Sequence, residues 1–122
     1  WFELFSVLRA HDYKPLKFMV HAFSGTPADL EKLLSLGGYV SFSLRFLSGA
    51  AEKARELCVR VPLDRLLVET DFPYMPLAGA AVAAPEYPGL LRRGYALTAE
   101  LRGMAEQDLI KAVWENGTIF TH

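Results

Sequence analysis

Three short apolar segments alternate along the chain with stretches in which apolar residues recur every three or four positions. The short segments, residues 17–23, 39–43 and 65–71, are bounded by polar residues, glycine or proline and predict β-strands. A helix is expected between the first two strands, with Thr26 as its N-cap and Gly37 and Gly38 at its end. A second helix is expected after the middle strand, capped by Ser48. Strands that alternate with helices predict right-handed β-α-β units, and therefore an α/β fold with a parallel sheet.

The two ends of the chain are predicted to be mostly helical. Residues 1–10 place aromatic and aliphatic side chains at helical spacing. Residues 77–89 contain Pro85, Pro88 and Gly89, so we expect a long loop there. Two further helices are predicted at residues 90–102 and 106–115, and Asn116 with Gly117 is expected to end the second of them.

Alternation along the strands predicts one polar and one apolar face of the sheet. The polar face would carry Met19, His21, Phe23, Tyr39, Ser41, Ser43, Glu69 and Asp71. Asp71 closes the third strand and His21 lies near the end of the first, and α/β folds bind their ligands at the carboxyl ends of parallel strands. An imidazole nitrogen and a carboxylate oxygen are ordinary ligands of a divalent ion. We therefore expect His21 and Asp71 to converge, with donor atoms roughly 3 to 4.5 Å apart.

Composition and charge narrow the class of protein. The chain has 122 residues, of which 52% are hydrophobic and 22% charged, as in globular proteins that bury a core. Its formal net charge of −1 supplies no general basic field, so any contact with DNA would require a local patch or a metal ion. The single cysteine, Cys58, excludes an internal disulfide and a cysteine-rich zinc site, and its helical surroundings predict a buried thiol. No run approaches the ~18 apolar residues of a membrane span, so we expect a soluble, cytoplasmic protein.

Several segments of the chain together resemble one known family. The stretch VRVPLDRLLVETDFP at residues 59–73 resembles the signature of the TatD family of metal-dependent deoxyribonucleases. The segments VHAFSG at residues 20–25 and YVSFS at residues 39–43 resemble two earlier strand motifs of that family, in matching order and spacing. Asn116 and Phe120 extend the likeness toward the end of the chain. The resemblance covers most of this chain but only the later half of a family member.

This resemblance implies a fold larger than the chain can build. Three strands cannot close a barrel, and an eight-stranded β/α barrel requires roughly 250 residues. The resemblance therefore makes residues 1–122 the C-terminal part of a single metal-dependent hydrolase barrel domain. The chain would supply the last three β/α units and the C-terminal helices of a TIM-type (β/α)8 barrel, and the N-terminal half of the barrel would be its missing partner.

The resemblance also implies a metal centre and the roles of three residues. Metal binding carries over to His21 and Asp71, the residues that match the family's ligands in the two motifs. Asp71 would also be the catalytic residue that accepts a proton from the attacking water. Glu69 belongs to the same motif and is expected to orient a ligand, because an unpaired buried carboxylate is costly. The family's remaining ligands, a His-x-His pair, a glutamate and another histidine, lie outside this chain.

The implied reaction is hydrolysis of DNA phosphodiester bonds by a metal-activated water, with one or two divalent ions, Mg²⁺, Mn²⁺ or Zn²⁺, as cofactors. Ser24, Ser43 and Arg45 lie just beyond strand ends and are candidates for contact with the substrate phosphate. Loop capping by the two serines and a solvated Arg45 explain these residues equally well.

Two other functions remain open at this point. The same barrel and the same two ligand positions serve amidohydrolases that act on amides or lactones, so the metal is better supported than the substrate. The chain could also be a non-catalytic fragment or interaction domain, because the upstream ligands are absent from it. Without the family likeness, His21 would more simply be a core histidine.

Overall fold

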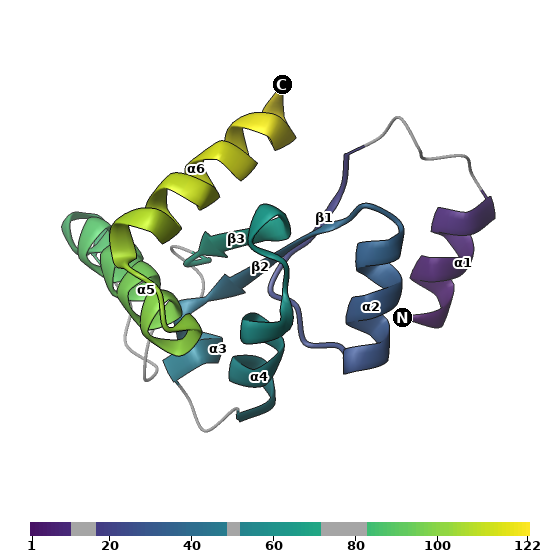
Figure 1. Cartoon of the computed structure of the whole chain (residues 1–122), viewed down its shortest axis with the longest axis horizontal. Helices are drawn as coiled ribbons and strands as arrows, with labels where there is room; N and C mark the ends of the chain where they lie inside the picture. Colours follow the sequence, from purple (N-terminus) through teal and green to yellow (C-terminus); the bar gives the residue numbers. More distant parts are fainter. Residues whose placement is uncertain (11–16, 49–51, 72–82) are drawn as a thin grey trace.

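The computed structural model describes residues 1–10, 17–48, 52–71 and 83–122. A parallel three-stranded sheet in the order β1-β2-β3 lies at its centre, surrounded by helices (Figure 1). The elements in chain order are α1 (Phe2–Ala10), β1 (Met19–Val20), α2 (Pro27–Ser35), β2 (Tyr39–Ser43), α3 (Leu44–Ser48), α4 (Glu52–Arg60), the 3-10 turn η1 (Leu63–Arg65), β3 (Leu66–Glu69), the 3-10 turn η3 (Ala84–Glu86), α5 (Tyr87–Arg102) and α6 (Glu106–Thr121).

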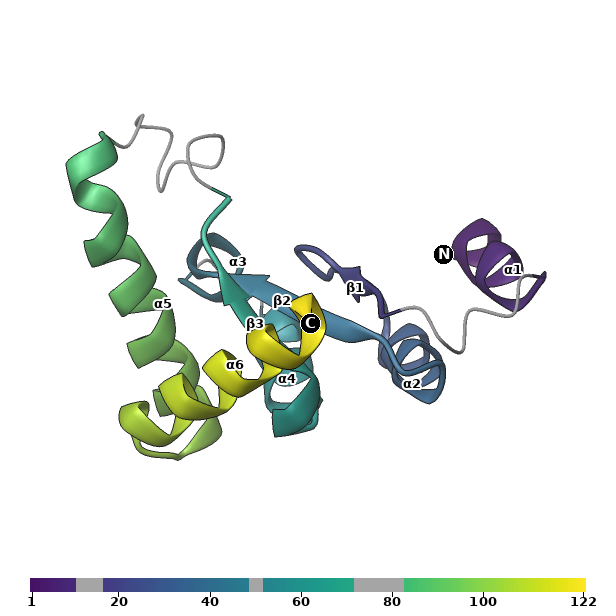
Figure 2. The same ribbon diagram turned by 90° about the horizontal axis from the view of Figure 1, so that it is seen from above.

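Four of the helices flank the two edges of the sheet. Helices α1 and α2 lie on the β1 side, and α5 and α6 lie beyond β3 (Figure 2). The central strand β2 is buried at all five positions and pairs with β1 on one side and β3 on the other. The predicted parallel α/β arrangement is therefore present, and the described strands form an open sheet.

The apolar face of the sheet builds the core. The register pairs Val40 with Val20 and with Leu66, so these side chains form one row across the three strands. Helices α2, α4 and α6 contribute further buried apolar side chains to the same cluster, which contains Phe5, Phe23, Leu30, Leu33, Val40, Phe42, Leu47, Leu57, Cys58, Val61, Leu66, Ala99, Leu109 and Val113. Among the described residues, no helix is long and apolar enough to cross a membrane.

The helix between the first two strands follows its predicted caps. Thr26 accepts the N–H of Asp29 on its side chain at 3.1 Å, and the Asp29 carboxylate accepts the N–H of Thr26 at 2.8 Å. This reciprocal pair is a capping box, and Pro27 occupies the first turn, where its missing N–H costs nothing. Gly37 takes the left-handed conformation, with φ of 81°, as the chain leaves the helix.

The prediction that Ser48 caps the second helix is wrong. Ser48 is the last residue of α3, a five-residue helix that directly follows β2 and that the sequence prediction missed. Leu44 and Leu47 of this short helix are both buried, and two positions are too few to reveal a helical period. The next helix, α4, begins at Glu52.

The loop expected at residues 77–89 ends earlier than predicted. Residues 77–82 lie outside the described part of the chain. Ala84–Glu86 form the turn η3 and α5 begins at Tyr87, three residues before the expected start. Pro88 lies in the first turn of α5, where the backbone N–H has no helical partner, so the proline starts the helix instead of breaking it.

The expected stop at Asn116 and Gly117 is also wrong, because α6 continues through both residues to Thr121. Asn116 is only 4% exposed and donates its side-chain N–H groups to the carbonyl oxygens of Leu63, at 2.7 Å, and Leu66, at 2.9 Å. The amide thus ties α6 to η1 and to the start of β3. Asparagine has a low helix propensity, but at this position its two hydrogen bonds to buried carbonyl groups offset that cost.

A second polar side chain joins α5 to the end of α4. The Arg102 guanidinium donates from Nη1 to the carbonyl oxygen of Cys58 at 2.6 Å and to that of Val61 at 2.8 Å. These carbonyls belong to the last turn of α4 and the residues after it, where backbone acceptors lack partners and a positive charge is favourable. The α4–β3 connection is therefore fixed from both α5 and α6.

The first strand differs most from its prediction. Regular pairing covers only Met19–Val20, and the chain turns at His21 and Ala22. Phe23, which simple alternation placed on the polar face with His21, instead packs edge-to-face against Phe42, with ring centroids 6.4 Å apart, in the apolar core. The turn inserts one residue into the alternation and so sends Phe23 to the opposite face.

We expect Cys58 to be inert in the folded chain. Its side chain is fully buried, and burial raises the pKa of the thiol to about 11, so the reactive thiolate is scarce near neutral pH. An aromatic disulfide reagent should modify Cys58 only after unfolding in guanidinium chloride. Stoichiometric labelling of the native chain at the rate of a free thiol would contradict this burial.

We expect Asn116→Leu to destabilise the chain by about 2–4 kcal/mol, because two buried carbonyl groups lose their donor. Asn116→Asp should be at least as damaging, since a carboxylate would face two carbonyl oxygens. Denaturant unfolding followed by circular dichroism measures both changes. The neighbouring exposed Glu115 offers a matched control, and Glu115→Gln should change stability by less than about 0.5 kcal/mol. Equal effects of Asn116→Leu and Glu115→Gln would exclude the proposed tie.

Candidate metal centre

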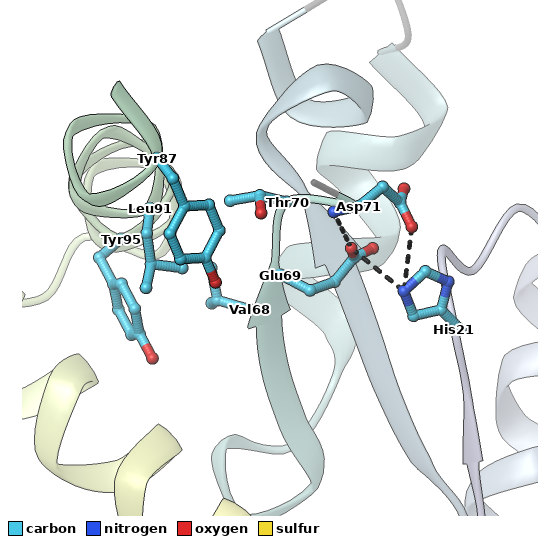
Figure 3. A pocket seen from close by; sticks show the side chains of 8 residues that line it. All are labelled: His21, Val68, Glu69, Thr70, Asp71, Tyr87, Leu91 and Tyr95. Carbon is cyan, nitrogen blue, oxygen red and sulfur yellow. Dashed lines mark hydrogen bonds and ion pairs between the residues drawn. The ribbon is translucent and has the colours of Figure 1, made fainter. Parts of the chain in front are cut away.

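Three side chains converge at the carboxyl ends of the outer strands. His21 follows β1, Glu69 ends β3, and Asp71 lies two residues further on. The Nε2 atom of His21 lies 3.0 Å from Oδ1 of Asp71 and 3.2 Å from Oε2 of Glu69 (Figure 3). Because β2 lies between β1 and β3, the trio spans the end of the central strand. The expected convergence of His21 and Asp71 is present, at the short end of the expected range.

The donor atoms of the trio suit a divalent cation. One imidazole nitrogen and one oxygen from each carboxylate lie within 4.8 Å of one another. The second carboxylate oxygens, Oε1 of Glu69 and Oδ2 of Asp71, are buried and have no hydrogen-bond partner among the described residues. Buried carboxylate oxygens without donors are costly, and a cation would satisfy them. The side chains of Glu69 and Asp71 are 15% and 13% exposed, whereas that of His21 is 50% exposed.

The electrostatics of His21, Glu69 and Asp71 also favour a bound cation. Burial raises the pKa of Glu69, the nearby His21 opposes this shift, and the negative charge of Asp71 adds to it. Two carboxylates in one partly buried site repel each other, and a bound positive charge relieves that repulsion. The site therefore favours a cation over an anion.

Glu69 also shapes the backbone at Asp71. Asp71 has a positive φ of 55°, and its N–H donates to Oε2 of Glu69 at 2.9 Å. Aspartate and asparagine enter this left-handed region more readily than most other residues. Glu69 was expected to orient a ligand, and this bond provides a way to do so. Its distance to His21 also lets Glu69 offer an oxygen directly to an ion, a role that the sequence reasoning did not give it.

The three candidate phosphate contacts lie in different surroundings. Ser24 and Arg45 are exposed, Ser24 just after the turn that follows β1 and Arg45 on α3. Ser43 is fully buried at the end of β2, and its hydroxyl has no hydrogen-bond partner among the described residues. Contact with phosphate stays a prediction for all three residues, and the burial of Ser43 makes it the weakest candidate.

A cavity of about 320 Å³ adjoins the acids. Its other wall is a row on α5, Tyr87, Leu91 and Tyr95, spaced four residues apart (Figure 3). Burial raises the pKa of the Tyr95 hydroxyl, with a smaller contribution from Tyr87. The sequence reasoning missed this wall because residues 87–89 were assigned to a loop, although the spacing of the three side chains is a helical signal.

Comparison with known proteins finds relatives that are named metal-dependent hydrolases. The family described as TatD related DNase matches residues 1–120. The uncharacterised metal-dependent hydrolase YcfH of Escherichia coli is 35% identical over 115 residues, which cover 93% of this chain and 43% of the relative. Deoxyribonuclease Tat-D of Saccharomyces cerevisiae is 36% identical over 58 residues, or 48% of this chain and 14% of the relative.

A solved structure agrees with these sequence relatives. The crystal structure of the TatD homologue YjjV from Escherichia coli superposes with a TM-score of 0.82 at 31% identity, and the match covers 97% of this chain and 45% of that one. The chain thus spans less than half the length of the relatives it matches. Its fold is that of the last three β/α units and C-terminal helices of a TIM-type barrel. The match over nearly the whole chain, together with the similar fold, shows that this chain belongs to the TatD-related DNase family.

Proposed function

We propose that this chain supplies part of the active site of a metal-dependent hydrolase that cleaves phosphodiester bonds in DNA. The observation that carries the proposal is the convergence of His21, Glu69 and Asp71, with two buried carboxylate oxygens that lack donors among the described residues. The yeast relative named a deoxyribonuclease supports DNA as the substrate. The Escherichia coli relatives, named only as metal-dependent hydrolases, support the metal and the reaction class.

In this proposal the three residues have distinct tasks. His21 offers a neutral imidazole nitrogen, and Asp71 offers a carboxylate oxygen. Glu69 holds the backbone N–H of Asp71 and offers its own oxygen toward His21. A bound Mg²⁺, Mn²⁺ or Zn²⁺ would supply Lewis acidity and lower the pKa of a water molecule. Asp71 would accept the proton of the attacking water.

The rest of the active site would come from an upstream half of the barrel. In the family that the chain resembles, further ligands come from a His-x-His pair, a glutamate and another histidine, and these lie outside this chain. The β3 strand pairs only with β2 among the described residues, so its other edge is open to a further parallel strand. In a closed barrel the last strand pairs with the first, which would bring the first strand's side chains next to Glu69 and Asp71.

We expect Mn²⁺ to raise the thermal unfolding midpoint of the chain, with EDTA reversing the shift, because a ligand that binds only the folded state stabilises it. At a free concentration of about 100 Kd the gain is about 2.7 kcal/mol. His21→Ala should abolish the shift. The exposed His122 offers a matched control, and His122→Ala should preserve it. No shift in the wild-type chain, or an equal shift in both variants, would count against a metal centre at the trio.

We expect little nuclease activity from this chain alone, and restored activity when it is joined to the upstream half of a TatD relative. In that complete barrel, Asp71→Asn should lower cleavage of a fluorescent oligonucleotide by about 10²–10⁴-fold, since the proton acceptor is lost. Asparagine adopts the positive φ readily, so the fold should be spared. Glu69→Gln should cost about 10–100-fold, because its amide oxygen can still accept the Asp71 N–H.

The relative effects of the two substitutions test the assignment. If Asp71→Asn kept near-normal cleavage at saturating Mn²⁺ while Glu69→Gln was inactive, the roles of the two acids would be reversed. Parallel assays with lactone and amide substrates address the alternative activity. Hydrolysis of those substrates without cleavage of DNA would show that the phosphodiester assignment is wrong.

A further inference from the structure

The turn after β1 is a bulge in a parallel ladder. The Tyr39 N–H donates to the carbonyl oxygen of Phe18 at 2.9 Å, and parallel pairing repeats every second residue, so positions 18, 20 and 22 should carry the ladder bonds. The Ser41 carbonyl should then receive the N–H of Ala22. It instead receives the N–H of Phe23, at 3.1 Å. One extra residue has therefore been inserted directly after His21, an arrangement that is rare between parallel strands.

The displaced N–H of Ala22 has a specific partner. It donates to the side-chain Oγ of Ser41 at 3.2 Å, so Ser41 binds both of the N–H groups that follow His21, one with its hydroxyl and one with its carbonyl. Ser41 is only 1% exposed and lies on β2, the strand buried at every position. The bulge is therefore closed by the fully buried central strand of the sheet.

The backbone at Ala22 is strained. Its φ is 48°, and among the described residues Ala22 and Asp71 are the two non-glycine residues with positive φ. The left-handed conformation reduces the population of an L-residue by a factor of roughly 5 to 30 relative to ordinary conformations. An alanine side chain offers no hydrogen bond of its own to offset this cost. The Ser41 hydroxyl bond to the Ala22 N–H, together with the carbonyl bond to the Phe23 N–H, favours the strained conformation.

We infer that Ser41 is a positioning residue for His21, which its hydroxyl holds toward Asp71 and Glu69 by fixing the bulge at Ala22. The bulge lets the His21 side chain face the acids while Phe23, two residues later, enters the core. Without the bulge, alternation would place both side chains on the same face. The inference rests on the proposed function only for the role of His21 as a metal ligand.

The test uses the metal-free, ¹⁵N-labelled chain, so its outcome is independent of any hydrolysis. Ser41→Ala should speed hydrogen exchange of the Ala22 amide by about three- to ten-fold, the worth of one hydrogen bond. It should also shift the ring signals of His21, while amides in the centre of α5 keep their protection. Ser41→Thr retains a hydroxyl and should restore the exchange rate and the ring signals.

The chain offers a matched control and a rescue. Ser43 lies two residues along the same strand and is equally buried, but its hydroxyl has no partner among the described residues, so Ser43→Ala should leave the Ala22 amide and the His21 ring unchanged. Glycine adopts positive φ without strain, so adding Ala22→Gly to Ser41→Ala should return the His21 ring signals toward those of the wild type. Unchanged His21 signals in Ser41→Ala, or no rescue by Ala22→Gly, would overturn the inference.

Discussion

The parallel pairing of β2 with both of its neighbours is the constraint on which the site depends. Each outer strand contributes to the trio, His21 from the turn after β1 and the two acids from the end of β3, yet these strands make no ladder with each other. Within the sheet, their relative position is set by the register of each against β2. A slip of one residue on either side would turn a ligand away from the others, because the side-chain period is two. The complete burial of β2 opposes such a slip.

The two strained residues show where this sheet departs from regular geometry. Ala22 and Asp71 both have positive φ, and each N–H is held by a side chain from the polar face, Ser41 and Glu69 respectively. Strain of this kind persists only where the surroundings fix it, and it gathers at functional sites. Both cases occur at the ends of the outer strands, where a group must be aimed across the end of β2. The polar face thus supplies the candidate ligands and also the acceptors that fix the backbone next to them.

Periodic patterns and local capping signals in the sequence predicted their elements correctly, whereas the single bulge and the tertiary hydrogen bonds were not predicted. The alternation in β2 and the caps of α2 have local signals, and both were predicted within their bounds. The face of Phe23 was predicted wrongly because a bulge leaves no trace in a hydrophobic pattern. Pro88 and the Asn116-Gly117 pair were treated as breakers, but the proline occupies a first turn and the asparagine meets carbonyls some 50 residues away in sequence. Such tertiary bonds override propensity and are not visible from nearby residues.

The helices beyond β3 border hollows that the described residues leave open. Helix α5 lies against the sheet at Gly94, where an added Cβ would make ordinary van der Waals contact with Val68, at 3.4 Å. Nearer its start the same helix diverges, and Tyr87, Leu91 and Tyr95 border the cavity beside the acids. A neighbouring groove shares Leu91 and Tyr95 and adds Ile110 and the largely exposed Trp114. Apolar side chains next to a strand edge that is unpaired in the described part of the chain favour covering by further structure. The upstream barrel half proposed above would supply a strand for this edge of β3 and a helix to cover Leu91, Tyr95 and Trp114.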